Sequence, residues 1–340
     1  MITKENIKDC VLSLILFSFG IFINRSITTD SHSLGENMKI YSEIFPANDG
    51  ILQPHRFLLP LFGKILNIDI QILNIIFLYI FILCCLLYLK NFNNYLTVLF
   101  FLAGLCSTMI FQFHINFGGY PDILSYLFLL LAYIFKEKKY FPYIMFLFAL
   151  LTKETVIFTI LFFLSLKNIS KLKIIFVTIL YLPVYFFTST GVFNWEFYFN
   201  PLDNNILYWI TQNSNYFLLG IFSSIKYFWF LLIYFVFKEK FNKSTYPIIF
   251  LLIGISFQFL LAGDITRLSS FIFLGIIYIM EKQELKKFNT SLILIAFLNV
   301  ITVKYYVFEP GILSIINESK LSFFDIFEQL RSLNLLLQQT

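Results

Sequence analysis

Lys153 and Glu154 stand side by side in a stretch that is otherwise almost wholly apolar from Tyr140 to Leu166. A charged group at membrane depth costs roughly 2.5–3.5 kcal/mol, so such groups usually face a protein-lined or water-filled cavity. Neighbours in sequence do not face each other on a helix, so each of these two charges needs a partner elsewhere. The pair is either a structural ion-pair junction between helices or part of a polar reaction site.

Four further ionisable residues stand at the ends of apolar segments. His114 closes one segment, Asp122 opens the next in "FGGYPDILSYLF", and Asp264 and Arg267 lie in "LLAGDITRLSSF" between two more. Each has an ordinary structural reading: an interfacial histidine, an acid beside the dipole of a helix start, and an ion pair three residues apart. Because all four fall toward the same predicted face, a shared polar site is the alternative that we favour.

The longest polar stretch, residues 25–71, supplies further candidates. Asp30 comes soon after the first apolar segment, and His55 and Arg56 precede the amphipathic run "FLLPLFGKIL". A carboxylate beside a membrane and a basic pair further along suit chemistry on an anionic, lipid-attached substrate. The plain reading of Asp30 is a polar residue that solvates a helix end.

These residue types could carry group transfer from a lipid phosphate. Such a transfer needs a carboxylate that takes a proton from the acceptor hydroxyl, and cations that hold the charge on the departing phosphate. Arginines can bind phosphate in bidentate fashion. The predicted catalytic residues are Asp30 and Asp122. Asp30 is the preferred base because a loop acid can meet a polar acceptor, and Asp122 is the alternative. The predicted substrate-binding residues are Arg56, His55, His114, Lys153, Glu154, Asp264 and Arg267.

Membrane-spanning helices must position these residues, because the composition suits little else. Of 340 residues, 59% are hydrophobic and 13% charged, with 46 Phe. Apolar segments about as long as a bilayer span recur between short polar breaks, which predicts an all-α polytopic membrane protein whose first outer loop carries short amphipathic helices. We predict about eleven transmembrane helices, at 8–24, 72–89, 95–113, 122–135, 140–152, 154–166, 172–188, 216–237, 246–262, 266–280 and 288–303.

The basic residues predict the orientation, since short cytoplasmic loops collect Lys and Arg. With the N-terminus in the cytoplasm, the predicted site lies outside and these Lys-rich breaks lie inside: 136–139, 167–173, 238–243 and 282–287. A single span from 140 to 166 would separate the first two breaks, so we predict that the helix breaks at Lys153. Each half then spans about 20 Å against roughly 30 Å of hydrocarbon, which places the charged pair below the outer surface.

We expect one integral domain over residues 1–340, with a transmembrane core at 8–303 and an amphipathic tail at 304–340. The tail sequence "FFDIFEQLRSLNLLL" has apolar residues near helical spacing and should lie on the membrane surface. The four Cys show no metal-type spacing and there are only three His, so we predict no disulfide, zinc site or cofactor. The net charge of +5 is accounted for by the inner loops, so no nucleic-acid partner is implied.

Several of these stretches resemble a known family of membrane enzymes. After an acid in the first loop come "HRFLLPLFGKIL", "GGYPDILSYLFLLLAYIFKEKKYFPYIMFLFALLTKETVIF" and "AGDITRLSSF". In this order, over about residues 8–303, they resemble small bacterial membrane proteins of GT-C type, which are similar to trimmed protein O-mannosyltransferases and lipid A aminoarabinose transferase. By position, the family's first-loop acid falls on Asp30, its arginine-leucine-proline stretch on Arg56 and Pro60, its second-loop acid on Asp122, and its lysine-glutamate junction on Lys153 and Glu154.

The resemblance implies a glycosyltransferase in the lipid bilayer. It would take a sugar from a polyprenyl-phosphate-linked donor on the extracytoplasmic face and pass it to a glycan, lipid or protein acceptor. The chain departs from the larger enzymes, because Ser31 and His32 follow Asp30 where a second acid would be expected, and no soluble domain follows the last predicted span. These departures leave metal dependence, acceptor recognition and a non-catalytic relative open.

Three other classes also fit the residues. A polysaccharide polymerase or ligase would be expected to carry a larger outer loop with several arginines. A lipid-linked sugar transporter or flippase would place buried charges near mid-membrane or on both faces, with internal repeats. A non-catalytic envelope assembly protein is the third. The one-sided predicted charges and the lack of a visible repeat favour the transferase.

Overall fold

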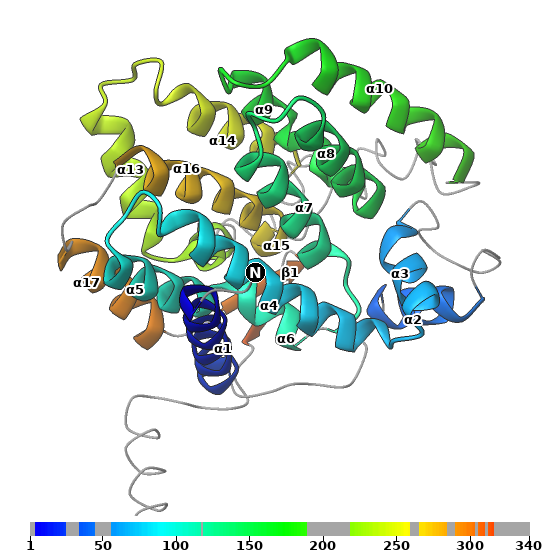
Figure 1. The fold of residues 1–340 in the computed structure, drawn as a ribbon, viewed down its shortest axis with the longest axis horizontal. Helices are drawn as coiled ribbons and strands as arrows, with labels where there is room; N and C mark the ends of the chain where they lie inside the picture. Colours follow the sequence, from blue (N-terminus) through cyan, green and yellow to red (C-terminus); the bar gives the residue numbers. More distant parts are fainter. Residues whose placement is uncertain are drawn as a thin grey trace, which may run out of the picture.

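Apolar helices form most of the described chain, as the composition predicts, and one short hairpin accounts for the β-structure in the parts that the structure describes (Figure 1). The computed structural model describes residues 4–24, 34–44, 56–116, 118–188, 218–258, 265–283, 290–302, 305–309 and 312–315. In chain order the elements are α1 (Lys4–Asn24), α2 (Leu34–Ile44), α3 (Leu58–Leu66), α4 (Ile70–Leu89), α5 (Tyr95–Cys106), α6 (Met109–Asn116), α7 (Asp122–Ile134), α8 (Phe141–Thr152), η1 (Glu154–Thr159), α9 (Ile160–Ser165), α10 (Lys171–Thr188), α13 (Phe228–Lys238), α14 (Tyr246–Gln258), α15 (Ile265–Ser269), η2 (Ser270–Ile272), α16 (Phe273–Gln283), α17 (Thr290–Ile301), β1 (Tyr305–Glu309) and β2 (Ile312–Ile315).

Two described helices are long and apolar enough to cross a membrane: α1, over Glu5–Ile23, and α4. Two bent pairs raise the number to four if each pair is one span. These pairs are α5 with α6, bent by 53°, and Leu218–Ile225 with α13, bent by 91°. Other predicted spans correspond to shorter apolar helices such as α7, α8, α14 and α17. By length and composition the described residues therefore give two to four candidate spans, fewer than the predicted eleven.

The bend between α5 and α6 lies within the predicted span 95–113, where we expected a continuous helix. Ser107 Oγ donates to the Ala103 carbonyl at 3.1 Å and Thr108 Oγ1 donates to the Leu105 carbonyl at 2.7 Å. Hydroxyl side chains of this kind satisfy backbone groups that a break leaves without helical partners. The bend changes the direction of the chain just before His114.

The second bend lies at Lys226, whose backbone adopts a left-handed conformation with φ 50°. Its Nζ donates to the carbonyls of Asn299 and Thr302 at 2.9 and 3.0 Å, at the C-terminal end of α17. A cation there complements the helix dipole. This buried lysine therefore joins the bend to α17.

The predicted break at Lys153 is confirmed. The α-helix α8 ends at Thr152, Lys153 is extended with φ −156° and ψ 120°, and the chain continues as the 3₁₀ helix η1. The backbone of η1 lies against α14 at Gly254, where an added Cβ would come within 1.9 Å of the Phe158 carbonyl oxygen. Glycine at 254 thus permits a backbone contact that fixes η1.

The Lys-rich breaks at 136–139 and 167–173 lie next to each other, as a broken helix requires. Asn168 donates to Glu137 Oε1 at 3.0 Å. Lys173 Nζ donates to the Lys139 carbonyl at 3.1 Å. The chain from α8 to α9 therefore leaves this end of the bundle and returns to it.

Helix α7 is central in the described bundle and packs against α4, α8 and α16 (Figure 1). Its side chains are buried nearly all round, as expected of a helix that is apolar on every side. Tyr126 makes an edge contact with the Phe271 ring at 5.1 Å between centroids. This packing fixes the position of Asp122 at the start of α7.

The far end of α7 carries a separate cluster around Glu281. Tyr88, Tyr133 and Lys136 all donate to Glu281 Oε2. Burial disfavours the charged carboxyl, but these hydrogen bonds outweigh it and lower the pKa of Glu281, which lies one residue beyond the predicted span 266–280. From Asp122 to Tyr133, α7 rises about 17 Å. One polar cluster lies at each end of this helix.

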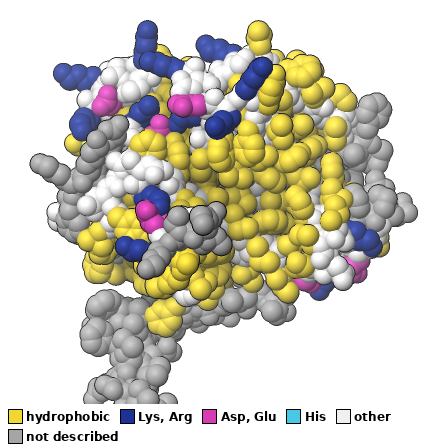
Figure 2. All heavy atoms as spheres, in the orientation of Figure 1, with side chains coloured by type: hydrophobic (Ala, Val, Ile, Leu, Met, Phe, Trp, Pro, Cys, Tyr) yellow, Lys and Arg dark blue, Asp and Glu magenta, His cyan; other side chains and the backbone are white. Residues whose placement is uncertain are grey.

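The face of the molecule shown in Figure 2 is broadly apolar where it is described. Large side chains such as Phe22, Phe176 and Phe237 are exposed. In Figure 2 most Lys and Arg side chains gather along the upper edge, beside a wide hydrophobic area. An apolar area of this breadth is typical of a surface that contacts lipid.

The C-terminal segment differs from the predicted tail in its first part. Residues 305–315 include the antiparallel pair β1 and β2, with Tyr305 opposite Ile315, and β1 packs against α15. The segment is rich in aromatic and β-branched residues, which favour strands. The hairpin itself was not predicted. The run "FFDIFEQLRSLNLLL", on which the prediction of an amphipathic tail rests, lies outside the described residues, so that prediction stays untested.

Candidate functional site

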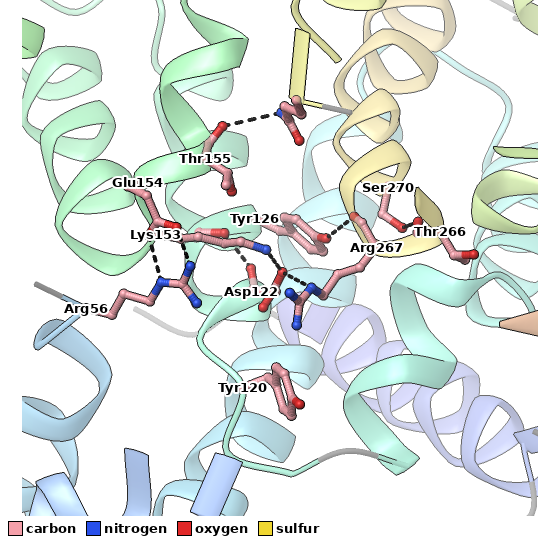
Figure 3. Close-up of polar contacts among 12 residues, drawn as sticks. Arg56, Tyr120, Asp122, Tyr126, Lys153, Glu154, Thr155, Thr266, Arg267 and Ser270 are labelled. Carbon is pink, nitrogen blue, oxygen red and sulfur yellow. Dashed lines mark hydrogen bonds and ion pairs between the residues drawn. The ribbon is translucent and has the colours of Figure 1, made fainter. Parts of the chain in front are cut away.

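Five of the predicted site residues form one charged network, although they come from four parts of the chain (Figure 3). Asp122 begins α7, Lys153 and Glu154 form the junction of α8 and η1, Arg56 precedes α3, and Arg267 belongs to α15. We call these residues the charged network. Lys153 and Glu154 each find a partner elsewhere, as predicted for adjacent residues.

The pair of Asp122 and Lys153 lies at the centre of the network. Lys153 Nζ donates to Asp122 Oδ1. Their side chains are 0% and 1% exposed, so neither charge is solvated by bulk water. The carboxylate also lies at the N-terminus of α7, where the helix dipole favours negative charge. Each charge therefore depends on the other, since a lone buried ion is strongly unfavourable.

Arg56 and Glu154 form a bidentate pair beside it. Arg56 Nε donates to Glu154 Oε2 at 2.7 Å and Nη2 donates to Oε1. Two parallel hydrogen bonds fix the plane of the guanidinium group. The third nitrogen, Nη1, is buried and has no hydrogen-bond partner within the described residues. Arg56 thus retains a donor that a ligand could use.

Arg267 approaches Asp122 from α15, with Nε 3.5 Å from Asp122 Oδ1. Its guanidinium lies 5.2 Å from the Tyr120 ring centroid and 5.6 Å from that of Phe113. Tyr126 OH donates to the Arg267 carbonyl at 3.2 Å, which holds the backbone of α15 against α7. Figure 3 shows Lys153 and Arg267 both directed at Asp122.

His114 is buried among aromatic rings close to the network. Its ring lies 5.3 Å from Phe113 and 5.7 Å from Tyr126, both edge-on. Neither ring nitrogen has a hydrogen-bond partner in the described parts of the chain, and the same holds for Asp122 Oδ2. Buried polar atoms are seldom left without partners, so unpaired atoms here point to a bound ligand or water.

The charges of the network do not cancel. Among the described residues, three cations, Arg56, Lys153 and Arg267, face two carboxylates, Asp122 and Glu154, so the described part of the network carries one more positive than negative group. A buried excess of positive charge is stabilised by an anionic group. Together with the free donor on Arg56, this suits a phosphate or carboxylate.

The structure brings together six of the nine predicted site residues: Arg56, His114, Asp122, Lys153, Glu154 and Arg267. Asp30, His55 and Asp264 lie outside the described residues. In the described parts, no three His, Cys, Asp or Glu side chains are grouped so that they could hold a metal ion. Tyr120 and Tyr126 were not predicted, since tyrosines in apolar segments give no signal that separates a site from packing.

No protein-family model, curated protein or solved structure matches the chain.

Proposed function

We propose that this protein is an integral membrane glycosyltransferase of GT-C type, with about eleven spans and its site on the extracytoplasmic face. It would transfer a sugar from a polyprenyl-phosphate-linked donor to a glycan, lipid or protein acceptor. The observation that carries the proposal is the charged network: within the described residues it is a buried site with three cations, two carboxylates, and polar atoms of Arg56, His114 and Asp122 that have no hydrogen-bond partner. Its place among apolar helices suits a donor whose anionic head is attached to a lipid.

In this proposal the cations hold the donor phosphate. Arg56 offers Nη1, and Arg267 lies against aromatic rings that keep its guanidinium in place. As the bond between the sugar carbon and the phosphate oxygen breaks, its electron pair stays with the phosphate. Arg56 and Arg267 stabilise that charge.

Asp122 is the base that the geometry favours. Lys153 donates to Oδ1, while Oδ2 has no hydrogen-bond partner among the described residues. Oδ2 takes the proton of the acceptor hydroxyl as the new bond from acceptor oxygen to sugar carbon forms. Asp30 is the alternative base, in which case Asp122 stabilises positive charge on the sugar.

The test is transfer of radiolabel from polyprenyl-phosphate sugars in isolated membranes. We compare wild type with Asp122→Asn, Asp30→Asn and Arg56→Lys, and use Glu137→Gln, an exposed carboxylate at the opposite end, as the control. Loss of transfer in Asp122→Asn with normal protein levels supports Asp122 as the base, and loss in Asp30→Asn alone assigns that role to Asp30. Full activity in both Asn variants contradicts the proposed mechanism, and no transfer by wild type from any donor contradicts the proposed function.

A lipid-linked sugar transporter is the second candidate, because buried ions also occur at the other end of the helices. The Glu281 cluster and the pair of Asp9 with Lys90 lie there. Glu281 Oε2 accepts three hydrogen bonds, however, whereas the charged network keeps unpaired atoms. Movement of labelled lipid across vesicles without formation of a glycosylated product would favour the transporter.

A further inference from the structure

Three polar side chains near Glu154 have a feature in common that the charged network does not explain. The hydroxyls of Thr155 and Tyr181 and the amide oxygen of Gln258 are buried without a hydrogen-bond partner in the part of the chain that the structure describes. Gln258 and Tyr181 are 1% and 2% exposed. Leaving such an atom unpaired costs roughly 1–3 kcal/mol, so three of them close to one site require an explanation.

Gln258 and Thr155 meet at the first turn of η1, and Tyr181 lies within electrostatic range of Glu154 and Arg56. Gln258, at the end of α14, donates its Nε2 to the Thr155 carbonyl at 3.3 Å, which leaves its Oε1 available. Tyr181, on α10, is close enough to interact electrostatically with both Glu154 and Arg56. Figure 3 shows the Thr155 side chain directed toward the charged network. Three different elements thus present polar atoms at the Glu154 end of the network.

None of these three side chains carries a charge. A phenol and a hydroxyl can each donate and accept one hydrogen bond, and an amide oxygen accepts. Sugar hydroxyls also donate and accept, whereas a phosphate only accepts and is bound better by the guanidinium groups nearby. A few fixed polar groups are the usual means by which a largely apolar site orients a ligand.

We propose that Thr155, Tyr181 and Gln258 form a separate subsite for the uncharged, hydroxyl-bearing sugar of the donor. Arg56 and Arg267 then bind its phosphate, and Glu154 lies between the two parts. This inference rests on the proposed function, because it assigns the sugar end of the same donor.

The test measures binding of two lipids to the full-length protein in detergent by native mass spectrometry. One probe is decaprenyl phosphate, and the other is decaprenyl phosphate that carries glucose, mannose or galactose. The variants are Tyr181→Phe and Thr155→Val, which remove one hydroxyl each and keep the shape of the side chain. Tyr143→Phe is the matched control, because the Tyr143 hydroxyl has a partner, the Ser170 amide, at the Lys-rich end.

We expect both variants to bind decaprenyl phosphate as wild type does, and to bind the preferred sugar-bearing lipid about 5- to 10-fold more weakly, as the loss of one hydrogen bond predicts. Equal weakening for both probes, or no change for either, would overturn the subsite and leave these atoms to buried water. The same conclusion follows if wild type prefers no sugar-bearing lipid over decaprenyl phosphate. If wild type binds neither probe, the proposed function itself fails.

Discussion

Lys153 donates to Asp122 across 31 positions of sequence, and both side chains are almost completely buried. The contact joins the start of α7 to the end of α8. The break after α8 is thereby bonded to the first residue of α7. Folding and the proposed chemistry therefore depend on the same pair.

The first prediction concerns this pair. Asp122→Asn leaves Lys153 with a buried charge and without its carboxylate, so we expect a loss of about 3–5 kcal/mol in the free energy of unfolding. The double variant Asp122→Asn with Lys153→Met removes both charges and should recover much of that loss. Chemical unfolding in detergent measures both values. Additive losses in the double variant would show that the two residues are not coupled.

The second prediction concerns Gly254. An added methyl would meet the Phe158 carbonyl oxygen at 1.9 Å, so Gly254→Ala must displace η1. We expect a loss of about 1–3 kcal/mol from overpacking and, because Glu154 begins η1, a lower rate of transfer. The control is Gly275→Ala, whose new methyl meets no backbone atom but the side-chain ends of Leu232 at 3.3 Å and Leu251 at 3.4 Å. Equal effects of the two substitutions on thermal unfolding would contradict the role of the close contact.

The third prediction is a pH dependence at Glu281. Its folded pKa lies below the ordinary value of 4.5, so its stabilising contribution is fully present above that value and is lost as the pH falls through the folded pKa. Wild type should therefore exceed Glu281→Gln in melting temperature near pH 7, and the difference should shrink below pH 4.5. Glu137→Gln, at an exposed carboxylate, is the control variant. A difference between wild type and Glu281→Gln that stays constant with pH would contradict this role.

The fourth prediction concerns sidedness. Because the Lys-rich breaks at 136–139 and 167–173 contact each other, single cysteines at Lys138 and Lys171 should react with a membrane-impermeant maleimide from the same side. The native cysteines are first replaced by serine or alanine. Our orientation predicts labelling in inside-out vesicles only. Labelling of the two positions from opposite sides would rule out the break at Lys153 as a change of direction.

The sequence predicts the charged network better than the helices around it. A lysine and a glutamate that are adjacent in an apolar stretch must separate, and this followed from helix geometry alone. Helix geometry did not identify their partners. Asp122 lies 31 positions from Lys153, Arg56 lies 98 positions from Glu154, and only the packing of the helices brings them close.

The features that the sequence did not predict have physical reasons. The bends at Ser107 and Lys226 lie inside apolar runs and have no Pro or Gly at the break. The hydroxyl of Ser107 satisfies backbone at the first bend, and at the second the Tyr227 amide donates to Asn299 Oδ1. Tyr181 and Gln258 are single polar residues in apolar helices, where a site and ordinary packing look alike. The hairpin formed by β1 and β2 was not predicted, because the tail was interpreted from the helical spacing of apolar residues in "FFDIFEQLRSLNLLL", which follows it in the sequence.

The two polar clusters at the ends of α7 have a consequence for motion. The start of α7 is bonded to Lys153 and its end, through Tyr133 and Lys136, to Glu281, so the helix can neither slide along its axis nor turn without breaking buried ionic contacts at both ends. We therefore expect α7 to keep its position when a ligand binds. Access for a large lipid must come from displacement of the elements around it, and α3 is a candidate because the Arg56–Glu154 pair links its N-terminal end to the network. Because Arg56 is also proposed to bind the phosphate, donor binding would alter the Arg56–Glu154 pair.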